Sequence, residues 1–149
     1  MTANTGRTNV KWIGVFIDNA GGTLTDVTAY CKDVGSFGLE RDEQDVTAYG
    51  DGVKNVTIGR PDAPLEFKFQ WDTTIFALLN ALGTTTPRTI DIRVGIEHAW
   101  EAGEPCFGIT SSATSGYVLK DLKATDSEIT ASFRVKGSTA PEWATAAHT

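Results

Sequence analysis

The sequence predicts a mainly β protein: an antiparallel β-barrel or sandwich with one flanking α-helix and one long hairpin arm. Three segments alternate polar and apolar residues, which is the period of half-buried strands. One segment instead spaces its apolar residues as a helix does. A third kind of segment has strand-forming residues on both sides of a glycine-rich turn but few apolar residues. The chain of 149 residues is long enough for one core, so we expect a single domain spanning residues 1–149.

The three alternating segments, 65–71, 88–96 and 128–136, supply the main strands. In each, we expect the apolar side chains to face the core and the polar ones to face water. On this pattern Asp91 and Arg93 belong to a solvent-facing side. Weaker strand patterns cover residues 11–18, 26–39, 105–110 and 117–123.

Residues 73–82 form the predicted helix. Their apolar side chains fall at positions 75, 76, 78, 79 and 82, which makes one stripe along a helix. Asp72 is a suitable N-cap, and Gly83 stands where a left-handed C-terminal cap belongs. We expect this helix to cover an end or a side of the β-structure.

The hairpin arm spans about residues 40–64, with its turn at Gly50-Asp51-Gly52. A lone two-stranded hairpin is marginally stable in water, so the arm needs contacts beyond itself. We therefore expect it to bind a neighbouring subunit through Arg41, Asp42, Glu43, Asp45, Val46, Tyr49, Asp51, Lys54, Val56 and Arg60.

The two ends lack both a period and a core pattern. Residues 1–10 and 137–149 are accordingly expected to be mobile arms in an isolated subunit. Trp143 stands out in the second of these ends. It is either a docking residue for a partner or a side chain that folds back on its own domain.

Composition narrows the classes of function. Apolar residues make up 40% of the chain and the net charge is −6, with basic residues scattered singly. A protein that grips nucleic acid is usually basic, so DNA is expected only as a passing contact. The start is polar and no long apolar run occurs, so we expect no secretory signal, no membrane segment, and synthesis in the cytoplasm.

Catalytic and metal-binding patterns are sparse. A pairing of Cys31 or Cys106 with His98 has no local motif to support it, and Cys106 between Pro105 and Phe107 resembles a core residue. No clustered zinc ligands occur, and the turn at residues 18–22 lacks the ligand density of a calcium loop. We expect no enzymatic activity, no cofactor, no metal and no disulfide.

The order of elements resembles the major tail tube proteins of long-tailed (siphovirus-like) bacteriophages. Residues 14–30 resemble that family's opening strand, turn and Thr-Asp second strand, and residues 43–52 resemble the start of its long loop. Residues 59–73 resemble the return strand, ending in an aromatic-Asp-Thr that opens the helix. Residues 128–137 resemble the closing strand, whereas residues 84–115 match no motif of the family.

The resemblance implies a structural virion protein. Its copies would close into rings, six in the family, and the rings would stack into a hollow tail tube through which viral DNA passes. It implies contacts with other copies and with tape-measure, tail-terminator and tail-tip proteins, and a location in the virion tail after assembly in the host cytoplasm. The alternative class is a monomeric β-sandwich that binds a ligand or decorates a particle surface, with Trp12, Trp100 and Trp143 as candidate contact residues.

Overall fold

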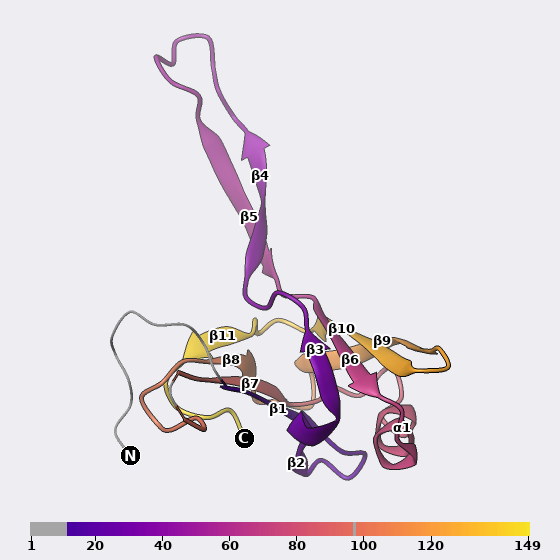
Figure 1. Cartoon of the computed structure of the whole chain (residues 1–149). Coiled ribbons are helices and arrows are strands. Elements are labelled where there is room, and N and C mark those ends of the chain that lie inside the picture. Colours follow the sequence, from indigo (N-terminus) through magenta and orange to yellow (C-terminus); the bar gives the residue numbers. More distant parts are fainter. Residues whose placement is uncertain (1–11, 97) are drawn as a thin grey trace.

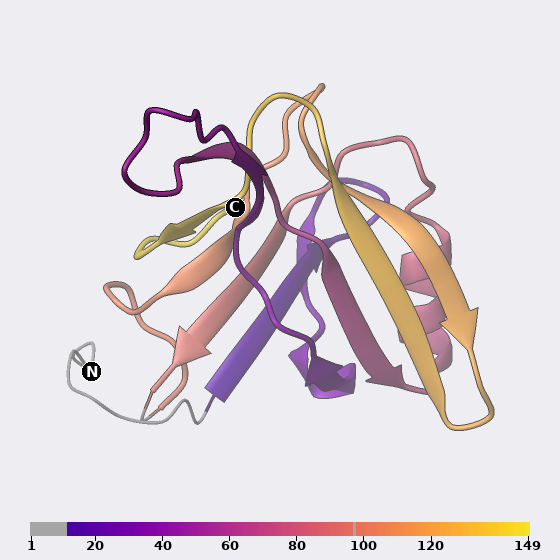
Figure 2. The ribbon, with the colours of Figure 1, turned by 90° about the horizontal axis from the view of Figure 1, so that it is seen from above.

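The computed structural model describes residues 12–96 and 98–149, and shows an open β-sandwich with one helix at its side and one hairpin projecting from it (Figures 1 and 2). The first sheet has the order β11 (Glu142–Ala144), β8 (Cys106–Ile109), β7 (Ile90–Gly95), β1 (Trp12–Asp18), β2 (Leu24–Asp26). The second has the order β3 (Cys31–Val34), β6 (Leu65–Gln70), β10 (Glu128–Lys136), β9 (Gly116–Ala124). All neighbouring strands are antiparallel. The predicted fold class is confirmed in its sandwich form, since the sheets do not close into a barrel.

The core lies between the two sheets and is built by the alternation seen in the sequence. In the first sheet Val15, Ile92 and Phe107 stand side by side on β1, β7 and β8 and are all buried. In the second sheet Phe67 of β6 lies beside Ala131 of β10, and both are fully buried. Burial of such side chains contributes roughly 1.5–3 kcal/mol for each large aliphatic or aromatic residue, which makes this interface the main source of stability.

Helix α1 (Thr73–Asn80) begins where the sequence predicts and ends two residues earlier. The Asp72 side chain accepts a hydrogen bond from the Thr74 amide at 2.7 Å, which confirms the N-cap. Gly83 has a φ of +68°, the left-handed conformation that glycine adopts at low cost. Ile75 and Leu79 are buried against the sandwich. At eight residues, the only α-helix of the described ranges is far too short to cross a bilayer.

The expectation that Asp91 faces water is wrong. Asp91 lies on the outer face of β7, as the alternation requires, yet it is fully buried. The C-terminal segment covers this face and brings the buried His148 against Asp91. The weaker pattern at residues 26–39 is also divided: it forms the end of β2, a 3-10 turn at Thr28–Tyr30, and β3.

Residues 137–149 dock on the domain, which corrects the expectation of a mobile C-terminal arm. β11 pairs with β8, with Trp143 opposite Phe107. The Trp143 ring lies 5.2 Å from the Phe107 ring and 5.6 Å from the Phe37 ring, measured between centroids. Aromatic contacts of this kind fasten a segment that carries no alternating pattern of its own. The prediction for residues 1–10 concerns a part of the chain outside the described residues.

Candidate functional site

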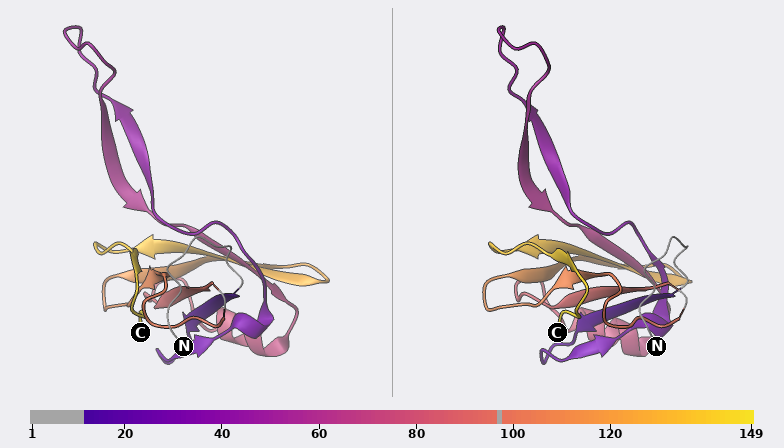
Figure 3. Two further views of the ribbon diagram at one scale, coloured as in Figure 1. Left: turned by 60° about the vertical axis from the view of Figure 1, so that its left-hand side comes forward. Right: turned by 90° about the vertical axis from the view of Figure 1, so that its left-hand side faces the viewer.

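The arm consists of β4 (Glu40–Asp45) and β5 (Val56–Asp62), and it stands away from the sandwich (Figures 1 and 3). Its strands pair with Asp45 opposite Val56, Glu43 opposite Ile58 and Arg41 opposite Pro61. Every residue of the two strands is exposed except Gly59, which is half-buried. The predicted hairpin is therefore confirmed, together with its lack of a core.

The base of the arm is fixed to the second sheet. The arm follows β3 and leads into β6, which are neighbours in that sheet. Between the arm and β6, the buried Tyr117 hydroxyl donates a hydrogen bond to the Ala63 carbonyl at 2.9 Å. The Asp62 carboxylate accepts one from the Ala63 amide at 2.8 Å. These bonds hold the arm at its root, whereas its strands touch little beyond each other.

The tip of the arm is an ordered loop of residues 46–55, longer than the expected turn at residues 50–52. The Asp51 amide bonds the Ala48 carbonyl at 3.0 Å, which places the tight turn at Ala48–Asp51. The Asp51 carboxylate in return accepts a hydrogen bond from the Ala48 amide at 2.8 Å, and Thr47 and Asn55 bond across the loop. Tyr49, at the centre of this turn, is fully exposed.

Hydrogen bonds also fix the charge of the tip. The Thr47 side chain and amide hold the pKa of the Asp45 carboxyl below its ordinary value. The Ala48 amide does the same for the pKa of Asp51. Both groups are therefore anionic at neutral pH. Over the whole arm, the carboxylates of Glu40, Asp42, Glu43, Asp45, Asp51 and Asp62 outnumber the basic side chains of Arg41, Lys54 and Arg60.

Exposed apolar side chains are concentrated on this acidic arm. Among the described residues, five of the nine large hydrophobic side chains left exposed belong to it: Val46, Tyr49, Val53, Val56 and Ile58. Exposed apolar surface on a projecting element is typical of a protein-binding surface. Among the described residues, the group of side chains close enough together to hold a metal ion lies in the sandwich and not on the arm.

The structure brings ten of the eleven predicted contact residues together on the arm. Six lie on its strands and four in its tip loop. Trp143 is the exception, because its ring packs on Phe37 and Phe107 of its own chain. It remains 48% exposed, next to the segment that leads into the arm. The sequence left both roles open for Trp143, and the structure places it back on its own domain.

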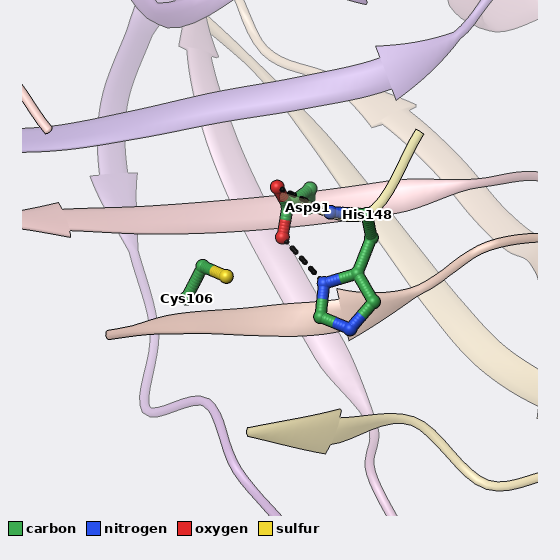
Figure 4. A group of neighbouring side chains, drawn as sticks. All are labelled: Asp91, Cys106 and His148. Carbon is green, nitrogen blue, oxygen red and sulfur yellow. Dashed lines mark hydrogen bonds and ion pairs between the residues drawn. The ribbon is translucent and has the colours of Figure 1, made fainter. Parts of the chain in front are cut away.

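A second candidate site is the buried group of Asp91, Cys106 and His148, which sequence reasoning missed (Figure 4). The His148 Nδ1 atom lies 2.9 Å from an Asp91 carboxylate oxygen. The other oxygen of Asp91 accepts hydrogen bonds from the His148 amide at 3.2 Å and from Arg93 Nε at 2.8 Å. The Cys106 sulfur lies 3.1 Å from the Ala146 carbonyl oxygen. These contacts fasten the C-terminal segment over the outer face of β7 and β8.

The chemistry of this group favours a structural role over catalysis. Burial, together with the nearby charge of Asp91, raises the pKa of the Cys106 thiol to about 11. A thiol attacks substrates as the thiolate, which is scarce at neutral pH for such a pKa. Asp91 is moreover already paired with the Arg93 guanidinium. His98, which the sequence offered as a partner for a cysteine, lies instead near Glu104, with 3.9 Å between its Nδ1 atom and the carboxylate.

Both cysteines are free thiols, and both are expected to react slowly with iodoacetamide in the folded protein. Burial raises the pKa of Cys31 to about 11 as well. At pH 8 the thiolate fraction, and with it the alkylation rate, should be roughly 100-fold lower than for thiols of pKa 9.0 in the unfolded chain. The rate should rise tenfold per pH unit towards pH 11, as followed by mass spectrometry at each residue. Rapid labelling of native Cys106 at pH 7 would contradict this expectation.

The raised pKa values of Cys31 and Cys106 also predict a loss of stability at alkaline pH. Because the thiol pKa values are higher in the folded state than in the unfolded one, the unfolded state releases protons first as the pH rises. The contribution of the two thiols to the free energy of unfolding is therefore complete below pH 9.0, and it falls as the pH rises from there towards about 11.

A cavity of about 220 Å³ lies on the outer face of the first sheet, among residues of β1, the start of the 3-10 turn and the loop after β7. Trp12, Phe16, Arg93 and Trp100 are among its lining residues. The Arg93 guanidinium lies 3.8 Å from the Phe16 ring centroid and 5.2 Å from that of Trp100, at cation–π distance. Two of the three tryptophans offered by the sequence, Trp12 and Trp100, thus share one cavity, whereas Trp143 lies elsewhere.

The arm, the buried group and the aromatic cavity differ in accessibility. Of these three, only the arm and the cavity present apolar surface to an outside partner, whereas Asp91, Cys106 and His148 are all buried.

No protein-family model matches the chain, and no curated protein matches it.

Proposed function

We propose that this protein is a structural subunit that assembles with copies of itself, and that it forms the tail tube of a long-tailed bacteriophage. The observation that carries the proposal is the arm: an ordered, exposed hairpin that holds most of the exposed apolar side chains of the described residues. The resemblance of residues 14–30, 43–52, 59–73 and 128–137 to major tail tube proteins supplies the biological setting.

The energetics of the arm favour a partner. Fixing the backbone of one residue costs about 1–2 kcal/mol, and an exposed hairpin gains little from its own contacts to offset this. Covering Val53 or Ile58 on another surface would contribute roughly 1.5–3 kcal/mol for each side chain that becomes fully buried. An arm that reaches a different surface on the next copy makes a heterologous contact, which either closes into a ring or continues as a filament.

In this proposal, the copies form rings, six per ring as in the family that the chain resembles, and the rings stack into a hollow tube. DNA passes through the tube as a transient passenger, which suits a subunit of net charge −6 because phosphate binding needs an excess of basic groups. The tape-measure, tail-terminator and tail-tip proteins are the further partners. The subunit is made in the host cytoplasm and works in the virion tail.

The alternative is a monomeric binding or decoration module. The aromatic cavity favours it, because concave apolar sites with a few polar groups bind ligands. At about 220 Å³, however, this cavity is smaller than the roughly 300–1,000 Å³ typical of small-molecule sites. The alternative also leaves the exposed apolar side chains of the arm without a role.

Size-exclusion chromatography with light scattering, combined with negative-stain imaging over a concentration series, separates the two functions. A tail tube subunit should form rings or tubes, and its mass should rise with concentration. A protein that stays monomeric at every concentration tested, with no rings or tubes on the grid, would contradict the proposal.

A further inference from the structure

Tyr49, here called the knob, is an aromatic side chain that projects from the tip of the arm and is suited to insertion into another protein surface. It sits in the Ala48–Asp51 turn at the tip of the arm, and its side chain is fully exposed. The loop beneath it is held by the Asp51 carboxylate on the Ala48 amide and by the Thr47–Asn55 bonds. The loop is therefore shaped before binding, so little entropy is lost when the ring is covered. Tyrosine is also among the residue types that dominate binding energy at protein interfaces.

The cavity lined by Trp12, Phe16, Arg93 and Trp100, here called the socket, has the character of a matching hole. Its lining is mostly apolar, and Trp12 on its rim is 54% exposed. A volume of about 220 Å³ is small for a free ligand but suits one side chain. Asp26 also lines it; its Oδ1 atom accepts hydrogen bonds from Thr28, and its second carboxylate oxygen can accept one from a phenol hydroxyl. Tyrosine, an apolar ring with one polar end, fits this combination.

Knob and socket lie on different layers of the same subunit. The arm leaves the sandwich from β3 and returns to β6, both in the second sheet. The socket lies on the outer face of the first sheet, because Gly14, Phe16 and Arg93 alternate with the buried residues of β1 and β7. The arm points away from the sandwich in all three views (Figures 1 and 3). An arm held in this way cannot reach the socket of its own chain.

We propose that Tyr49 at the arm tip of one copy inserts into the socket of a second copy of this chain. This inference rests on the proposed function, for which it names the contact between neighbouring subunits. Because knob and socket are different surfaces, each copy can give one contact and receive one, as rings and tubes require. The exposed Val46 and Val53 beside Tyr49 would lie against the rim of the socket near Trp12.

A second cavity fits the aromatic ring of Tyr49 less well. This wider cavity, of about 570 Å³, lies on the outer face of the second sheet, over β6, β10 and β9. Its lining is dominated by charged and hydroxyl side chains, among them Lys123, Asp121 and Ser132. An aromatic ring placed there would leave polar groups desolvated without partners, which costs free energy.

The test uses two full-length variants, Tyr49→Ala and Trp12→Ala, each at an exposed position where folding is little affected. Each variant alone should associate on the order of 30-fold more weakly than the parent protein, as expected for the loss of an interface anchor. An equimolar mixture should form a 1:1 dimer and nothing larger, because the knob of Trp12→Ala meets the socket of Tyr49→Ala while the opposite contact is broken. Sedimentation velocity of each variant and of the mixture measures this directly.

Tyr49→Phe and Trp12→Phe are the matched controls. Both retain an aromatic ring, so the dissociation constant of each variant should lie within about tenfold of that of the parent protein. A change of this size corresponds to the loss of one hydrogen bond at most. A mixture of the two alanine variants that stays monomeric where the parent protein assembles would overturn the inference. So would assembly of Tyr49→Ala alone at parental strength. In either case, if a variant that lacks the arm also fails to assemble, the arm is still the element that connects the copies. Its binding surface on the second copy is then not the socket.

Discussion

Replacing residues 42–60 with an Asn-Gly turn is expected to give a folded β-sandwich that no longer assembles. Arg41 and Pro61 are paired across the base of the hairpin, so a two-residue turn can join them without strain on the body. The deleted residues are exposed apart from the half-buried Gly59, and the Tyr117–Ala63 hydrogen bond at the root remains. The body should therefore keep its stability while the contact surface is lost.

Two measurements decide this prediction. Thermal unfolding of the arm-less variant should follow that of the parent protein closely, since removal of exposed residues changes stability by about 0.5 kcal/mol or less per site. Light scattering should report a monomer at concentrations where the parent protein forms rings or tubes. Tubes of normal length from the arm-less variant would show that other surfaces carry the assembly.

A matched control keeps the arm and changes one exposed polar side chain outside the expected contact residues. Gln44 is exposed, lies opposite Thr57 in the hairpin and is not among the expected contact residues, so Gln44→Thr should leave both the folding and the shape of the arm unchanged. Its assembly should stay close to that of the parent protein, in contrast to the arm-less variant. Such a result would assign the effect to the apolar surface and to the shape of the arm.

The sequence predicted those elements whose own pattern of burial decides their structure. Alternation located β6 and β10, because the apolar side chains of each strand lie on one face, as the exposed Glu66 between the buried Leu65 and Phe67 illustrates. The helix was found because its apolar stripe and its Asp72 cap are local. The arm was found for the opposite reason, since a hairpin pattern without apolar faces indicates an element outside the core.

The features that the sequence did not predict depend on which segment of the chain covers which face of a sheet. Alternation reports the side of the sheet on which Asp91 lies, but not that His148, far away in the chain, covers that side. The docking of Trp143 against Phe107 is equally a matter of distant segments, because residues 137–149 have no period of their own. The socket likewise unites Trp12 with Trp100 from separate loops and strands. Such pairings leave no local pattern from which they could be predicted.

Leu79→Ala in α1 is expected to lower the free energy of unfolding by roughly 2–5 kcal/mol, the range for removal of a fully buried leucine. Leu79 has no exposed surface and belongs to the main core, so the surrounding side chains cannot fill the cavity left behind. Leu78→Ala is the matched control, because Leu78 lies on the same helix and is only partly buried.

The two substitutions change helix propensity equally, so their difference isolates burial in the core. Urea unfolding followed by tryptophan fluorescence should therefore show a clearly larger loss for Leu79→Ala than for Leu78→Ala. Because the arm lies outside this core, residual folded Leu79→Ala protein should still assemble, which separates stability from the contact surface. Equal stability of Leu79→Ala and the parent protein would mean that this stripe is not buried within the subunit, and the helix would then be a surface for a neighbour.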